Sequence, residues 1–334
     1  MNYQLSSPLN GQRFTLPPFF VIIVISLLMV AFSGGAEASQ KRLAYIVSDL
    51  RIPFWEIMKR GIEHRAGELG YKIDPYSADN SAKQEIEWVA KAIKERVDGI
   101  IISPTNSSAA VTLLRLAQGA RIPVVIADIG SDGGEYVSYI ASDNFAGSYQ
   151  LGKLLVTAFQ QRQWDSGSVG IIGIPQTRAN GKARTAGFMK ALNEAGIKGG
   201  DLRQQVDFSY QETYDFSREL IAANPELRAL WLQGSDRYQG ALDAIAAAGK
   251  QGEILLLCFD AEPEFLDLIP QGTLVGAGMQ QPFLIGEEAV DALDAHLKGQ
   301  AVLQKRLLPV LPVSAENIKR LLPVIQRNVL GLVP

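Results

Sequence analysis

Short apolar runs alternate with amphipathic stretches along the chain from Leu43 onward. The runs have the length of strands buried on both faces, and the stretches between them carry apolar residues three and four positions apart, as one face of a helix requires. This order predicts parallel strands joined by crossover helices. In the first series we expect strands at 43–47, 71–76, 99–102, 123–127 and 136–140, and helices at 53–69, 82–96, 108–118 and 144–159.

A second series of elements repeats this rhythm. The segments 68–72 and 194–198 resemble each other, and the apolar strands that begin at 123 and 254 are both followed by an aspartate, Asp128 and Asp260. Such internal similarity predicts an α/β fold with two doubly wound parallel-sheet lobes that face one another. In this series we expect strands at 169–174, 204–208, 229–232 and 254–259, and helices at 183–194, 213–223, 238–248 and 263–268.

The remaining pattern gives a strand at 274–279, a helix at 282–297 and a strand at 307–313. Ser314 is a candidate cap for a last helix. Pro323 lies inside that helix and is expected to break or kink it, because proline lacks the backbone donor. The pattern makes no prediction for the last ten residues.

The first forty residues differ in kind from the rest. A fourteen-residue apolar run at 19–32 precedes Gly34-Gly35 and the small-x-small sequence Ala36-Glu37-Ala38, which predicts a signal peptide at 1–38. The run is shorter than the ~20 residues that span a bilayer. Arg13 is the only basic residue before Lys41, so an uncleaved anchor remains the alternative. We expect an exported protein, periplasmic if the cell has two membranes.

The composition is that of a globular protein. The 334 residues are 47% hydrophobic and 20% charged with a formal net charge of −3, which allows a sizeable core and two domains. No long run of Lys or Arg offers a surface for nucleic acid or an anionic membrane. The only cysteine, Cys258, lies in an apolar run, so we expect a buried core thiol and no internal disulfide.

One stretch, 48–55, stands out as a candidate ligand-binding element. It follows the first strand, and Pro53 suits the first turn of a helix whose inner face already has enough apolar residues. The two aromatics in that turn, Phe54 and Trp55, are more than packing requires. Because open α/β sheets bind ligands at the carboxyl ends of their strands, we expect both rings to form a ligand wall. The alternative is that they only cap the core.

Residues that follow the other strands extend this candidate site. Aromatic rings can stack on the C–H surfaces of a polar ligand, while carboxylates, a guanidinium and an amide hydrogen-bond its polar groups. Asp128 and Asp260 could instead be turn or capping residues, and Asp236 and Arg237 are expected to be a cap and a surface pair. Trp231 is assigned to the core. The candidate ligand-binding residues are Asp49, Phe54, Trp55, Ser103, Asp128, Arg184, Phe208, Asp260 and Gln280.

Catalytic and cofactor motifs do not occur in the sequence. His64 and His296 are the only histidines, and neither has a Cys or His partner at the spacing of metal ligands. The phosphate-loop, Gly-x-Gly-x-x-Gly and Gly-x-Ser-x-Gly patterns do not occur either. We therefore expect a protein that is not an enzyme and uses no metal or cofactor.

Seven short motifs occur in the order seen in one known family. The chain from Lys41 to about Ser314 resembles the periplasmic solute-binding proteins of the ribose-binding type, whose type 1 fold is shared with lac-repressor-type regulators. The motifs are Pro53-Phe54-Trp55, Asp98-Gly99-Ile100-Ile101, Ile122-Pro123-Val124, Ser142-Asp143-Asn144, Arg184 with Gly187-Phe188, Phe259-Asp260, and Gln280 with Pro282.

The resemblance implies a role for each matched position. Phe54 and Trp55 would form one aromatic wall and Phe208 the other, while Asp128, Arg184, Asp260 and Gln280 would hydrogen-bond the ligand. The hinge would lie near Asp143, Gln280 and Pro309. The resemblance implies an N-terminal lobe of 41–142 plus 282–309 and a C-terminal lobe of 143–281 plus 310–334.

Four polar positions of the family pattern are altered here. Ile52 and Ser103 stand where the ribose-binding pattern has asparagine, Ile129 where it has arginine, and Gly234-Ser235 where it has Asn-Asp. Because an unpaired ligand hydroxyl is costly, we do not expect ribose itself. We expect a sugar or sugar-like solute with fewer or differently placed hydroxyls; a quaternary ammonium solute over the Trp55 ring is the alternative.

The resemblance also implies a partner. We expect a monomer that closes on its solute and presents it to the membrane permease of an ABC importer. The rival is a periplasmic sensor subunit that signals to a histidine kinase or chemoreceptor. A DNA-binding regulator is disfavoured because no basic helix-turn-helix precedes the first lobe, and a hydrolase because no nucleophile has its base.

Overall fold

The computed structural model describes residues 40–332 and Met1. The expected signal peptide and its cleavage after Ala38 lie outside this part of the chain. Between residues 40 and 332, no helix combines the length and apolar character needed to cross a membrane. Residues Lys41–Pro334 form one compact unit.

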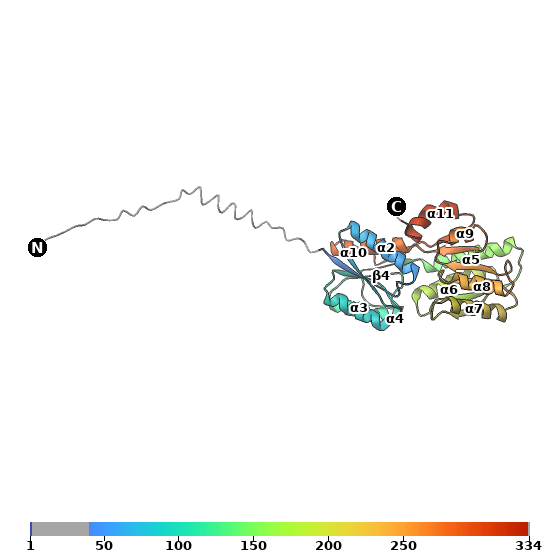
Figure 1. Ribbon diagram of the computed structural model, residues 1–334, viewed down its shortest axis with the longest axis horizontal. Helices are drawn as coiled ribbons and strands as arrows, with labels where there is room; N and C mark the ends of the chain where they lie inside the picture. Colours follow the sequence, from blue (N-terminus) through green and yellow to red (C-terminus); the bar gives the residue numbers. More distant parts are fainter. Residues whose placement is uncertain (2–39, 333–334) are drawn as a thin grey trace. The chain divides into compact units, whose positions relative to one another are not determined.

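The first lobe is built on a six-stranded, fully parallel sheet. Helices α2 and α10 cover one face, where Met58 and Ile62 pack with Ile285 and Leu293, and α3 and α4 cover the other face (Figure 1). The strand order is β11-β5-β4-β3-β1-β2. The elements are β1 (Arg42–Val47), α2 (Pro53–Glu68), β2 (Lys72–Ser77), α3 (Ala82–Lys94), β3 (Gly99–Ser103), α4 (Ser107–Gly119), β4 (Val124–Ala127), β5 (Ser138–Ser142), α10 (Pro282–Leu297) and β11 (Lys305–Leu308).

The second lobe has a sheet of the same size, in the order β12-β10-β9-β8-β6-β7. Its strands are parallel except for β12, which is antiparallel to β10. Helices α5 and α6 cover one face, and α7, α8 and the C-terminal helices cover the other. The elements are α5 (Asn144–Gln161), β6 (Ser168–Gly173), α6 (Ala179–Glu194), β7 (Lys198–Gln204), α7 (Tyr210–Ala223), β8 (Leu227–Leu232), α8 (Tyr238–Ala247), β9 (Leu255–Phe259), α9 (Phe265–Leu268), β10 (Gly276–Met279), β12 (Leu311–Ser314), α11 (Ile318–Val324) and the π-helix η1 (Ile325–Val329).

The predicted α/β class with two doubly wound lobes is confirmed, and so are two core assignments. Cys258 is fully buried, and Trp231 stacks on Phe188 with ring centroids 3.9 Å apart. The chain passes from one sheet to the other after β5, after β10 and between β11 and β12. As a result, the carboxyl ends of the strands of both sheets border the same cleft between the lobes.

Two strand predictions were wrong. The strand expected at 204–208 is β7 at Lys198–Gln204, an edge strand whose glycines and charged residues give no apolar signal. The apolar run at 307–313 forms two strands, β11 and β12, one in each sheet. Pro309 lies between the two strands, and its carbonyl accepts a hydrogen bond from Nε2 of Gln281 at 2.8 Å. Proline has no backbone N–H to donate to a sheet, so it separates β11 from β12.

The C-terminal segment also differs from its prediction. Ser314 ends β12 and does not cap α11, and α11 continues through Pro323 into η1. The bond from the Leu330 N–H to the Ile325 carbonyl, at 2.9 Å, has the five-residue spacing of a π-helix, which accommodates the chain after the proline. Ile325 and Val329 pack into the core of the second lobe.

Candidate functional site

A cavity lies between the lobes at the carboxyl ends of their strands. Its lining includes seven of the nine predicted ligand-binding residues: Phe54, Trp55, Asp128, Arg184, Phe208, Asp260 and Gln280. Phe54 and Trp55 belong to the first turn of α2 and Asp128 follows β4, all in the first lobe. The other four come from the second lobe, in α6 or after β7, β9 and β10.

Three of these residues have left-handed backbone conformations. The φ angles are 66° at Asp128, 72° at Asp260 and 52° at Phe208. The two aspartates are equivalent in the two lobes, because each N–H still bonds the neighbouring strand at 2.9 Å, to Ile140 and Gly278 respectively. A phenylalanine in this region is strained, and strained residues concentrate at functional sites.

The aromatic residues come from both lobes. The Phe54 and Trp55 rings meet edge to face, with centroids 6.1 Å apart. Trp55 is only 4% exposed and packs in the core of the first lobe, and it also lines the cavity. Phe208 lines the cavity from the second lobe. The arrangement offers flat apolar surfaces on both sides of the cleft.

Three buried polar atoms of the lining have no hydrogen-bond partner within residues 40–332. They are Nε1 of Trp55, Oδ1 of Asp128 and Oε1 of Gln280. Each such buried group costs about 1–3 kcal/mol when it stays unpaired. The residues that carry this one donor and these two acceptors all line the cavity, which makes the three atoms candidates for hydrogen bonds to a polar ligand.

One buried ion pair and a second buried carboxylate, that of Asp128, set the electrostatics. Arg184 is 3% exposed, and it donates from Nε to Oδ1 of Asn144 at 2.7 Å and from Nη1 to the Gln233 carbonyl at 2.6 Å. Its Nη1 also lies 3.7 Å from Oδ2 of Asp260. Burial raises the pKa of Asp128 to about 6 and also raises the pKa of Asp260, and in both cases the positive charge of Arg184 opposes the effect.

The remaining two predicted residues lie outside the cavity. Ser103 is fully buried below it and donates to Sδ of Met58 at 3.6 Å. Asp49 accepts hydrogen bonds from Arg51, at 2.8 and 2.7 Å, and from Asn80 at 3.1 Å. The structure therefore gives both side chains partners within the first lobe.

Asp236 requires a correction. It pairs with Arg237 as expected, but Asp236 itself is not a surface residue, because it lines the cavity. Burial raises the pKa of its carboxyl group.

The sequence predictions missed four polar residues of the lining. Arg178 and Asn180 lie at the start of α6, which begins four residues earlier than expected. Gln205 follows β7, whose position was predicted wrongly, and Gln233 directly follows β8. The mainly polar segment from Gln176 to Asn180 follows a buried strand, and this position at a strand end could have identified Arg178 and Asn180 as cavity residues.

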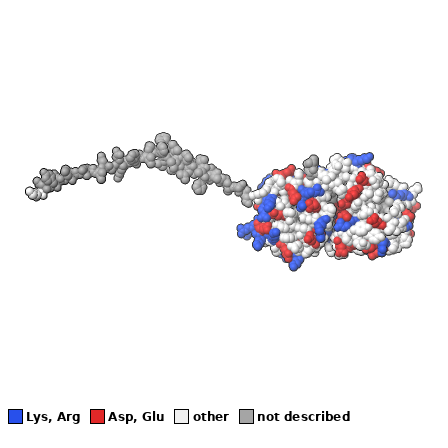
Figure 2. Space-filling view, viewed as in Figure 1, with Lys and Arg blue, Asp and Glu red and all other residues white. Residues whose placement is uncertain are grey.

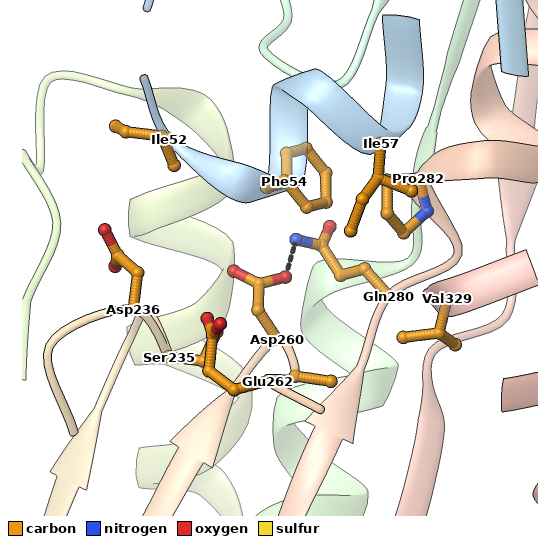
Figure 3. A pocket seen from close by; sticks show the side chains of 11 residues that line it. Ile52, Phe54, Ile57, Ser235, Asp236, Asp260, Glu262, Gln280, Pro282 and Val329 are labelled. Atoms are coloured by element: carbon orange, nitrogen blue, oxygen red, sulfur yellow. Dashed lines mark hydrogen bonds between the residues drawn. The ribbon is translucent and has the colours of Figure 1, made fainter. Parts of the chain in front are cut away.

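A second hollow adjoins the first across the Asp260–Gln280 pair (Figure 3). Ile52, Phe54 and Ile57 of the first lobe face Asp236, Asp260 and Glu262 across this space. Glu262 accepts a hydrogen bond from Ser235 at 2.8 Å, and burial raises its pKa to about 7. Val329 of the C-terminal segment completes the lining.

Charged side chains of both signs lie on the surface outside the cavity. On the face shown in Figure 2, basic and acidic side chains are interspersed and do not form an extended basic surface. Within the described part of the chain, no group of three or more His, Cys, Asp or Glu residues is placed to hold a metal ion.

Comparisons with known proteins agree with this architecture. A family model described as "Periplasmic binding protein domain" matches residues 43–301. The ribose import binding protein of Haemophilus influenzae is 31% identical, over 84% of this chain and 93% of its own length. The D-allose-binding periplasmic protein of Escherichia coli is 25% identical, over 82% of this chain and 90% of its own.

Solved structures show the same fold. A carbohydrate transporter solute-binding protein from Agrobacterium radiobacter, in complex with D-arabinose, superposes with a TM-score of 0.80 at 22% identity and covers 88% of this chain and 100% of its own. A periplasmic solute-binding protein from Actinobacillus succinogenes with bound D-allose has a TM-score of 0.77 at 23% identity and covers 84% of this chain and 99% of its own.

Proposed function

Because this chain belongs to the periplasmic binding protein family, we propose that it captures a sugar or sugar-like solute between its lobes and delivers it to an ABC importer. One observation carries the proposal. Trp55, Asp128 and Gln280, each with an unpaired buried polar atom, line one cavity that has aromatic rings on both sides. A sugar has apolar C–H faces and a polar rim, so it satisfies both features at once.

We propose seven ligand-binding residues: Phe54, Trp55, Asp128, Arg184, Phe208, Asp260 and Gln280. Their positions in the cavity lining support this assignment. We also propose the lobe boundaries given above, since they agree with the division of the strands between two sheets. The lobes would rotate about the crossings near Asp143, Gln280 and Pro309 when they close.

The same cavity bears on the identity of the ligand. Ile52 and Gly234 line it, and neither side chain can hydrogen-bond a hydroxyl. We therefore propose a sugar whose hydroxyls are arranged differently from those of ribose. The names of the relatives and neighbours above support sugars and import, and they give no support to a methylamine ligand or a sensor-kinase partner. We further propose export to the periplasm by a cleaved signal peptide and no enzymatic activity.

A thermal-shift screen of the purified protein tests the function. The panel is D-ribose, D-allose, D-arabinose, D-tagatose, D-fucose and myo-inositol, with choline as the non-sugar comparison. A ligand at a thousand times its Kd stabilises the folded state by about 4 kcal/mol, which is an easily measured rise in Tm. Stabilisation by at least one sugar is the expected result. Stabilisation by choline alone, or turnover of any compound, would contradict the proposal.

A further inference from the structure

Arg178 connects the two lobes at the mouth of the cleft. Arg178 belongs to the second lobe, at the residue that precedes α6, yet its side-chain hydrogen bonds go to the first lobe. Nε donates to the Thr105 carbonyl at 3.0 Å, and Nη2 lies 3.5 Å from Oγ of Ser48 and from Oδ1 of Asn80. The residue is only 6% exposed. None of these acceptors lies on a segment where the chain crosses between lobes, so opening of the cleft must break all three contacts.

The first lobe holds the acceptors in place. Glu85 is fully buried and accepts hydrogen bonds from the N–H and hydroxyl of Thr105, at 2.9 and 3.0 Å. Oγ of Ser107 accepts the N–H of Ala179, next to Arg178, at 3.1 Å. Glu85 therefore fixes the Thr105 carbonyl before the lobes meet. The bond from Ala179 to Ser107 is a second hydrogen bond between the lobes, next to that of Arg178.

The same guanidinium faces the ligand cavity. Arg178 lines the cavity, and its central carbon lies 5.7 Å from the centre of the Trp55 ring and 5.6 Å from that of Phe208. Its third nitrogen, Nη1, has no hydrogen-bond partner among residues 40–332. Ile129, where the family pattern has an arginine, is fully buried in the core, so Arg178 supplies a guanidinium from the opposite lobe.

We propose that Arg178 is a specificity and closure residue, which holds the closed lobes together through Nε and Nη2 and donates from Nη1 to an oxygen of the bound sugar. This inference rests on the proposed function. Arg178 would select sugars that have a hydrogen-bond acceptor on the edge of the ring that faces the start of α6. Because closure follows the first encounter with the ligand, Arg178 acts on the dissociation rate and not on the association rate.

The test compares R178M and R178K with the wild type, and R218M serves as a matched control because Arg218 is an exposed arginine of α7. Spin labels at K83C and Q211C, both exposed, report the distance between the lobes. Distances are measured without sugar and with a mixture of D-ribose, D-allose, D-arabinose and D-tagatose. Stopped-flow fluorescence with each sugar gives the two rate constants.

The expected result is specific to R178M. Sugar dissociates from it at least about tenfold faster, its association rate changes less than about twofold, and its loaded form shows longer and broader distances than the wild type. R178K is intermediate and R218M matches the wild type. An unchanged dissociation rate and distance, or a lowered Tm of the unliganded R178M without a change in the ratio of the two rates, would overturn the inference.

Failure of the proposed function gives a different pattern. In that case the wild type binds none of the four sugars, and the unliganded distances alone decide the role of Arg178. A closed wild type with an open R178M would then support the closure role, and identical distances would overturn it.

Discussion

Replacement of Asp128 by asparagine should weaken ligand binding and at the same time stabilise the unliganded protein. The carboxyl group is 2% exposed, its Oδ1 has no partner within the described residues, and its backbone has a φ of 66°. Asparagine keeps the shape and tolerates the left-handed conformation, so the change removes the charge with little strain.

The magnitude follows from the raised pKa of Asp128. Burial raises this pKa from 3.8 to about 6, so the folded state binds the proton more tightly than the unfolded state. The charge therefore costs nothing below pH 3.8, and its cost grows as the pH rises to about 6 and then stays constant. At 1.36 kcal/mol for each pH unit, the full cost is about 3 kcal/mol, and D128N should be more stable than the wild type by up to this amount at pH 8.

Binding should change in the opposite direction. A hydrogen bond to a charged acceptor contributes about 1.5–3 kcal/mol, so the Kd for the best sugar of the screen should rise about 10- to 150-fold. Urea denaturation at pH 4, 6 and 8 and calorimetric titration measure the two effects, with D165N as a control at an exposed aspartate. The reasoning is refuted if D128N is less stable than the wild type at pH 8, or if it binds sugar equally well.

Four further variants test other features of the structure. S103A and D49N should leave the Kd within about twofold of the wild type in calorimetric titration, because both side chains have partners outside the cavity; a tenfold loss would return them to the site. G61A should lower the free energy of unfolding by about 1–3 kcal/mol in urea, because a Cβ there would overlap the Phe283 carbonyl between α2 and α10, and wild-type stability would contradict this packing. R327Q should lower that free energy by only about 0.5–1 kcal/mol, since Arg327 pairs with Glu287 at 2.9 Å while half-exposed, and a loss above 2 kcal/mol would show that the C-terminal segment matters more than its contacts indicate.

The sequence pattern predicted the buried strands well and the edge strands poorly. The strands β3 and β4 are continuous apolar runs because helices cover both faces of the sheet, and the pattern placed both within a residue. The edge strand β7 is half-exposed and reads Lys-Gly-Gly-Asp-Leu-Arg-Gln, so its position depends on pairing with β6 and not on hydrophobicity.

The residues of the cavity were also predicted unevenly: those directly after buried strands were identified, and those defined by contacts between the lobes were not. Asp128 and Asp260 were found because each directly follows a buried strand, which fixes its place at the cleft. Arg178 was missed because its side-chain contacts are with acceptors of the other lobe, 73 residues away at Thr105 and 98 at Asn80. Ser103 is the last residue of β3, but its side chain points to Met58, and the strand position alone could not reveal that orientation.

The most direct test of the account is a crystal structure of the protein with the sugar that gives the largest thermal shift. The account predicts the sugar ring between Trp55 and Phe208, with hydrogen bonds to Asp128 and Gln280. A sugar bound elsewhere on the protein, with this cavity filled only by water, would contradict it.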